Sequence, residues 1–107
     1  MLTQLSRRDW PHFFARLSAA LAVRPASVDT SGLEEDLPGE WIRLRSAAFD
    51  AESGELALLL EGERRLGRHP RQVYVHLDGD LLHSMELVDA DERRDFVVLH
   101  RPLQLLL

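Results

Sequence analysis

The chain has 107 residues, of which 45% are hydrophobic and 29% are charged, and it contains no cysteine. A chain of this size and composition is expected to form one soluble globular domain, residues 1–107, with no membrane-spanning segment. The absence of cysteine excludes disulfides, thiolate nucleophiles and iron–sulfur clusters, and a net charge of −5 makes nucleic acid an unfavourable partner.

All 13 basic residues are arginine, and asparagine is also absent. The codons of lysine and asparagine are rich in A and T, so the composition indicates a G+C-rich bacterial genome. Without lysine the chain can form neither a Schiff base nor a Walker phosphate loop. The segment Met1 to Arg8 lacks the apolar core of a secretory signal, so the cytoplasm is the expected compartment.

The first predicted element is an amphipathic helix, which ends before Pro25. Its start has two interpretations, Ser6 with Asp9 as a capping box or Asp9 itself as the N-cap. Pro11 favours the second, because a proline at the second helical position gives up no backbone bond. The buried stripe is formed by Trp10, Phe13, Phe14, Leu17, Ala20 and Leu21.

A weak alternation over residues 26–30 predicts a short strand, and the polar stretch 31–40 predicts a loop. Residues 42–49 and 56–60 then predict a β-hairpin around the turn 50–54. Pairing Ala48 with Leu56 stacks Leu44 on Leu60 and sets Arg43 opposite Glu61, so apolar and charged residues agree on one register.

A second hairpin is predicted from residues 73–77 and 81–87. A two-residue Asp78-Gly79 turn would split the apolar residues between both faces, which favours a three-residue loop ending at Asp80. The following segment, Phe96 to Leu99, is apolar at every position and predicts a strand buried on both faces.

These elements predict an α+β fold, with the N-terminal helix packed on a mainly antiparallel, hairpin-connected sheet of about five strands. One helix covers only one face of such a sheet. The surplus of apolar strand residues predicts either a curled, partly closed sheet or a second subunit on the open face. The tail leucines, which pack either on their own sheet or at a subunit interface, are Leu103, Leu105, Leu106 and Leu107.

Four segments together resemble a family of small bacterial proteins known as a domain of unknown function. They are Ser6…Asp9-Trp10…Phe13-Phe14…Leu17-Ser18, Leu44…Ala48-Phe49-Asp50, Pro70…Val73 and Met85-Glu86-Leu87-Val88-Asp89-Ala90-Asp91. The chain departs from the family's pattern at Leu66-Gly67-Arg68, where a histidine often precedes the proline, and at Glu92, where a glycine often follows the Asp-x-Asp turn. The resemblance implies a fold and assigns no catalytic residue.

One dense basic run stands out in this acidic chain, between the two hairpins. Guanidinium groups bind phosphate or carboxylate in a bidentate manner, so the run is a candidate anion-binding site. The alternative is a solvated loop whose charge is balanced by neighbouring glutamates. The run consists of Arg64, Arg65, Arg68, His69 and Arg71.

No metal site is predicted, although His69, His76 and His83 recur every seven residues. Residues seven apart on a strand point to opposite faces, and the predicted register separates His76 from His83 in the same way.

Acidic residues and serines give no catalytic constellation either. The carboxylates lack the spacing of a calcium loop, and no serine lies in a G-x-S-x-G setting. We expect Asp50 and Asp89 to accept hydrogen bonds from turn amides. No catalytic residue and no cofactor is therefore assigned. The three acidic groups are Glu34-Glu35-Asp36, Asp50 with Glu52 and Glu55, and Asp89 with Asp91 and Glu92.

Three functions follow from these patterns. The first is a non-catalytic interaction domain that self-associates, with a homodimer as the expected state and no other protein partner identified. The second is anion or nucleic-acid binding through residues 64–71, and the third is a metal-dependent or carboxylate-based enzyme.

Overall fold

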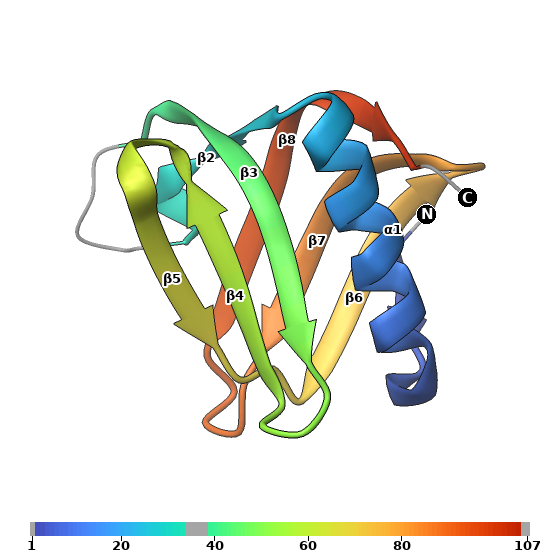
Figure 1. The fold of residues 1–107 in the computed structure, drawn as a ribbon. Helices are drawn as coiled ribbons and strands as arrows, with labels where there is room; N and C mark the ends of the chain where they lie inside the picture. Colours follow the sequence, from blue (N-terminus) through green and yellow to red (C-terminus); the bar gives the residue numbers. More distant parts are fainter. Residues whose placement is uncertain (1, 34–38, 106–107) are drawn as a thin grey trace.

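The computed structural model describes residues 2–33 and 39–105. In this part of the chain, a single α-helix, α1 (Trp10–Val23), packs on one antiparallel sheet of eight strands, so the predicted fold class is confirmed and the predicted number of about five strands is too low (Figure 1). The sheet order is β1-β6-β7-β8-β2-β3-β4-β5. The strands are β1 (Leu2–Leu5), β2 (Ala26–Asp29), β3 (Trp41–Asp50), β4 (Glu55–Leu60), β5 (Arg64–Arg68), β6 (Gln72–Asp78), β7 (Leu81–Val88) and β8 (Arg94–Gln104).

The sheet curls so that β3, β4 and β5 lie in front of β6, β7 and β8, as Figure 1 shows, but it does not close. Its end strands, β1 and β5, do not pair with each other. The helix α1 lies along the opening beside β3, in front of β6. The Oγ of Ser18 donates to the carbonyl of Ala47 on β3 at 2.5 Å, and Arg16 pairs with Asp80 after β6 at 3.1 Å. The helix therefore bridges the two halves of the curled sheet.

The hydrogen bond from Ser18 to β3 gives a direct test of this contact between α1 and the sheet. We expect Ser18→Ala to lower the free energy of unfolding by about 1 kcal/mol, because one side-chain hydrogen bond is lost without a large cavity. Chemical denaturation measures the change. Ala19→Ser is the matched control, because Ala19 is exposed on the same helix, and a loss of equal size in both variants would contradict the assigned role.

Both ends of α1 agree with the sequence. The helix begins at Trp10 with Asp9 in the N-cap position and Pro11 in the first turn, although the Asp9 side chain makes no capping bond. The 3-10 turn Arg7–Asp9 precedes it. At the other end Arg24 is extended, with φ −148° and ψ 99°, as the proline that follows requires.

The first hairpin is confirmed, but its register differs by one residue near the turn. Leu44 pairs with Leu60 as predicted, whereas Ala48 pairs with Ala57 rather than Leu56. An irregularity between Leu44 and Ser46 causes the shift, because it inserts Arg45 as an extra residue on β3. The backbone N–H of Arg43 donates to Glu61 Oε1 at 3.2 Å, so the two predicted neighbours meet through a main-chain donor.

The predicted three-residue loop of the second hairpin is wrong. Asp78 pairs with Leu81, which leaves a two-residue turn with Gly79 at φ 62°. A register shift after His76 then aligns Val75 with Met85. The bulge at His83, rather than a longer loop, keeps the apolar residues of both strands on the core side.

The prediction that Phe96 to Leu99 is buried on both faces is also wrong. Val97 and Leu99 point into the core, with exposed fractions of 1% and 8%. Phe96 and Val98 point to the opposite face and are 45% and 40% exposed. In the described residues, the half of the sheet that contains β8 thus presents large apolar side chains to solvent.

Candidate interaction surfaces

The outer face of β1, β6, β7 and β8 is the first candidate site. Paired residues on neighbouring strands share a face, so the register defines two rows across these four strands. We call this surface the outer sheet face. Its first row is Gln4, Tyr74, Glu86 and Phe96, and its second row is Leu2, His76, Ser84 and Val98.

Charge on the outer sheet face is locally balanced. Arg94 on β8 forms an ion pair with Glu86 on β7, next to Phe96. The hydrogen bond that Arg94 donates to Glu86, together with the negative charge of Glu86, raises the pKa of Arg94 above its ordinary value, so this guanidinium carries its charge at every physiological pH.

Beyond the second row, β8 brings His100 against Trp41 at the start of β3. Their ring centroids are 4.7 Å apart in a T-shaped arrangement, and Trp41 is 51% exposed. Sequence reasoning missed Trp41, Phe96 and Val98 as surface residues. The continuous apolar segment around Phe96 looked like a buried strand, and only the strand order shows which face has no cover.

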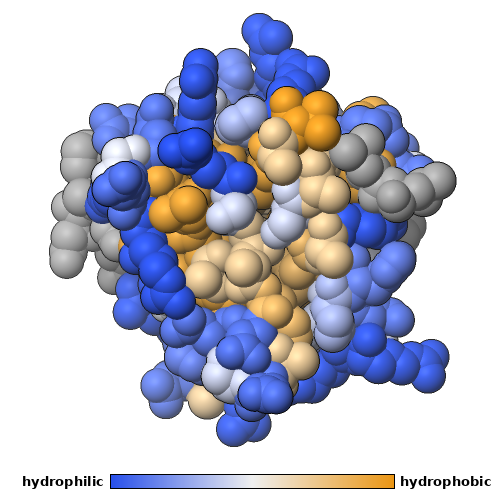
Figure 2. All heavy atoms as spheres, in the orientation of Figure 1, coloured by the Kyte–Doolittle hydropathy of each residue, from blue (hydrophilic) through white to orange (hydrophobic). Residues whose placement is uncertain are grey.

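The opposite side of the molecule, formed by α1 and β3 to β5, has a different apolar surface. Figure 2 shows a central hydrophobic zone there with a hydrophilic rim. A hollow of about 220 Å³ in this region is lined by Phe14, Ala15, Ser18, Ala47 and Ala48, among others. Four of its seven lining residues are alanine or serine, which offer little contact area to a partner, so the hollow is a weaker candidate than the outer sheet face.

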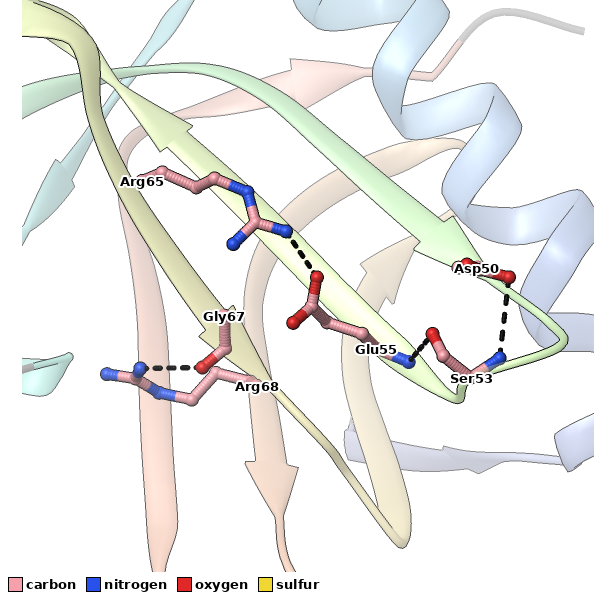
Figure 3. A network of polar contacts seen from close by, with 6 residues as sticks. All are labelled: Asp50, Ser53, Glu55, Arg65, Gly67 and Arg68. Carbon is pink, nitrogen blue, oxygen red and sulfur yellow. Dashed lines mark hydrogen bonds and ion pairs between the residues drawn. The ribbon is translucent and has the colours of Figure 1, made fainter.

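The predicted basic run is not one loop. Residues 64–68 form the edge strand β5, whose side chains alternate between two faces. Arg65 lies on the same face of β5 as Gly67. It forms an ion pair with Glu55 on the neighbouring strand β4 (Figure 3). Arg64 and Arg68 lie on the other face of β5, with the buried Leu66.

Arg68 has a structural partner at the far side of the curled sheet. Its Nε donates to Asp95 Oδ2 of β8 at 2.9 Å, and its Nη2 donates to the carbonyl of Leu33 at 2.8 Å. Asp95 is only 7% exposed. Arg68 thus ties the edge strand β5 to β8, while His69 and Arg71 are exposed beyond it. The structure does not bring the five residues of the run to one point, and anion binding by them stays a prediction.

Two of the four C-terminal leucines are buried within their own chain. Leu103 and Leu105 are 5% and 3% exposed within the single chain, and the N–H of Leu105 donates to the carbonyl of Asp80 at 2.9 Å. Leu106 and Leu107 lie outside the described residues. The tail contributes to the core, and its part in an interface stays a prediction.

The predicted separation of His76 and His83 is wrong. Their rings stack at 4.7 Å with an interplanar angle of 26°, because the bulge at His83 turns its side chain to the face of His76. Across residues 2–33 and 39–105, no three histidine or carboxylate side chains gather into a metal-binding group.

The acidic turns have the structural role expected of them. Asp50 Oδ1 accepts from the backbone N–H of Glu52 at 2.9 Å, and Asp89 Oδ1 accepts from those of Asp91 and Arg93 at 2.9 Å. The acidic group Glu34-Glu35-Asp36 lies outside the described residues.

The chain was compared with known protein families, curated proteins and solved structures. A family model described as a family of unknown function (DUF5335) matches residues 1–106. No curated protein and no solved structure matches the chain. In the part of the chain that the structure describes, no helix has the length and apolar character needed to cross a membrane.

Proposed function

Because the chain belongs to this family of unknown function, we propose its role from its own geometry: it is a non-catalytic interaction domain that self-associates through the outer sheet face. The carrying observation is the pair Phe96 and Val98, which are 45% and 40% exposed on β8, at the side of this four-strand face where the 3-10 turn η2 (Thr30–Gly32) approaches Phe96. A broad sheet face suits contact with another protein better than enclosure of a small substrate.

The side chains on this face are of the kind that stabilise interfaces. Phe96 and Tyr74 lie in one row, and Leu2 and Val98 lie in the next. Aromatic side chains bury about 150–250 Å² each and dominate interface energetics. Exposed apolar residues that lie together on one face mark interaction sites more often than isolated ones do.

The charge of the outer sheet face favours a second copy of the chain. In a two-fold dimer, the same surface meets itself, so a patch of one sign would repel its copy. The Glu86–Arg94 ion pair places both signs beside Phe96, which allows each carboxylate to meet the partner's guanidinium. The net charge of −5 elsewhere makes two copies repel at long range, so added salt should strengthen association.

The dimensions of the face are compatible with a small dimer. Four strands spaced about 4.8 Å apart, with four to eleven residues each at about 3.4 Å per residue, cover about 500 Å² of flat area. Side-chain relief adds to this value, and stable interfaces bury about 800 Å² per partner.

Sedimentation velocity of the full chain over a range of concentrations tests the proposal. The parent should form a dimer at micromolar concentration, and Phe96→Ala should weaken the association about 30-fold, because removal of a central aromatic anchor costs about 2 kcal/mol. Circular dichroism should show that this variant keeps its fold, since Phe96 is a surface residue.

Val23→Ala is the matched control, because Val23 is 75% exposed but lies on α1 and not on the outer sheet face. Its association should equal that of the parent. A parent that stays monomeric at high concentration would overturn the proposal, and so would equal association of the Phe96 and Val23 variants.

A further inference from the structure

A second feature, distinct from the outer sheet face, is a hollow of about 360 Å³ where the end of α1 meets the bent part of β8. It is lined by Arg24 after the helix, by Ser27 of β2, by Arg43 of β3, and by His100 and Arg101 of β8. Two prolines help to create it. Pro25 and Pro102 lack an N–H donor and lie at this place on the two facing segments, so a regular backbone ladder cannot continue there. The single β2–β8 bridge is Val28 with Leu99.

Three arginines line the hollow, and its described lining contains no carboxylate. Elsewhere in the described chain, Arg16, Arg65, Arg68 and Arg94 each pair with an acidic side chain. Residues 2–33 and 39–105 provide no such partner for the arginines of the hollow. This arrangement concentrates positive potential in a chain whose net charge is negative.

Two nearby groups of opposite sign do not cancel this potential. Glu61 accepts a bond from the backbone N–H of Arg43 and lies toward β4, on the side away from β2. The carbonyl end of α1 carries a partial negative charge, about half an elementary charge, beside Arg24. Arg43 and Arg101 therefore supply most of the uncompensated charge.

An aromatic group borders the hollow. His100 contacts Trp41 at 4.7 Å between ring centroids, and half of the Trp41 side chain is exposed. Guanidinium groups bind phosphate through paired N–H donors, and an exposed indole offers a stacking surface for a planar ring. The volume lies within the range of small-molecule sites, which is about 300–1,000 Å³.

We propose that this hollow binds the phosphate groups of a small phosphorylated molecule, with Arg43 and Arg101 as the principal ligands and Arg24, Ser27 and His100 completing the site. A second copy of this chain that meets the hollow with its own hollow, about a two-fold axis, is a poor occupant, because the two arginine-lined surfaces would repel each other. The site is independent of self-association, since it uses neither Phe96 nor Val98.

Titration with pyrophosphate and with ADP, in about 50 mM salt, tests the proposal. Intrinsic fluorescence can report binding, because Trp41 is exposed whereas Trp10 is 1% exposed, and calorimetry gives the affinity. The double variant Arg43→Gln, Arg101→Gln should lose affinity for both probes at least tenfold, since two charge-assisted contacts disappear. Added salt should weaken binding by the parent.

The matched control is Arg8→Gln, Arg93→Gln, which removes the same charge from two exposed positions outside the hollow. It should bind both probes like the parent. Absence of binding by the parent to either probe would overturn the proposal, as would equal affinity in the two double variants.

The two probes also distinguish the source of the phosphate. Tighter binding of ADP than of pyrophosphate, removed by Trp41→Ala, would support a nucleotide-like ligand stacked on the indole. Equal affinities would support recognition of the phosphate groups alone. If a short RNA binds the parent far more tightly than ADP does, and the hollow variant loses that binding, the assignment to a small molecule is overturned.

Discussion

Replacing Trp10 with alanine is expected to lower the free energy of unfolding by about 3–5 kcal/mol, the range found for large aromatic side chains removed from a core. Trp10 is 1% exposed, and its ring meets Phe49 of β3 edge-on with centroids 5.7 Å apart. Its Nε1 also donates to the carbonyl of Leu5 on β1 at 3.3 Å. The substitution removes contacts to both halves of the sheet and leaves a cavity at the start of the helix.

Trp41→Ala provides the matched control for this prediction, because it makes the same chemical change at a side chain that is 51% exposed. Its effect should stay within about 1 kcal/mol, as for other surface substitutions. Urea unfolding of both variants followed by circular dichroism measures the difference. Similar losses in the two variants would show that Trp10 does not anchor the helix to the sheet.

The second large effect is expected at the ion pair between Arg68 and Asp95. We expect Asp95→Ala to cost about 2–4 kcal/mol, because it leaves the Arg68 guanidinium, 22% exposed, without its carboxylate. This is somewhat less than the cost of breaking a fully buried pair, since water still reaches part of the arginine. The substitution removes a side-chain link between β5 and β8, two strands that are not joined by backbone hydrogen bonds.

Two further variants separate this role from a general effect of charge. Glu55→Ala removes the partner of Arg65 at an exposed position and should cost less than about 1 kcal/mol. The double variant Arg68→Met, Asp95→Leu should recover much of the stability lost in Asp95→Ala, because apolar residues can replace a buried pair. If Asp95→Ala costs no more than Glu55→Ala in denaturant unfolding, the contact between β5 and β8 does not depend on this pair.

The sequence predicted the elements that have a strong period. The helix stripe from Trp10 to Leu21 is buried as expected, and Pro25 ends the helix. The edge strand β5 escaped prediction because its sequence, Arg-Arg-Leu-Gly-Arg, has the composition of a solvated loop. It is a strand because its backbone pairs with β4 and one arginine finds a partner on β8, and both are contacts distant in sequence.

The register errors have a common cause. Extra residues at Arg45 and His83 shift the pairing by one position, and no local pattern marks them. The position of such a bulge is determined by the burial of apolar residues on the core face of the sheet.

The candidate sites depend even more on tertiary structure. Arg24, Arg43 and Arg101 are far apart in the sequence and meet only because β2 lies between β3 and β8. Likewise, the exposure of Phe96 follows from the face on which α1 packs. No spacing along the chain encodes either arrangement.

The strand order also determines when the protein can fold. β8 is the last strand in the described chain, yet it occupies the centre of the sheet between β7 and β2. During synthesis, the segment from β2 to β5 can form its hairpins early, but its contacts with the other half must wait until β8 has left the ribosome. Until then, the apolar inner faces of both halves stay open to other chains. Folding should therefore be slow for a domain of this size, since its decisive contacts join distant parts of the chain.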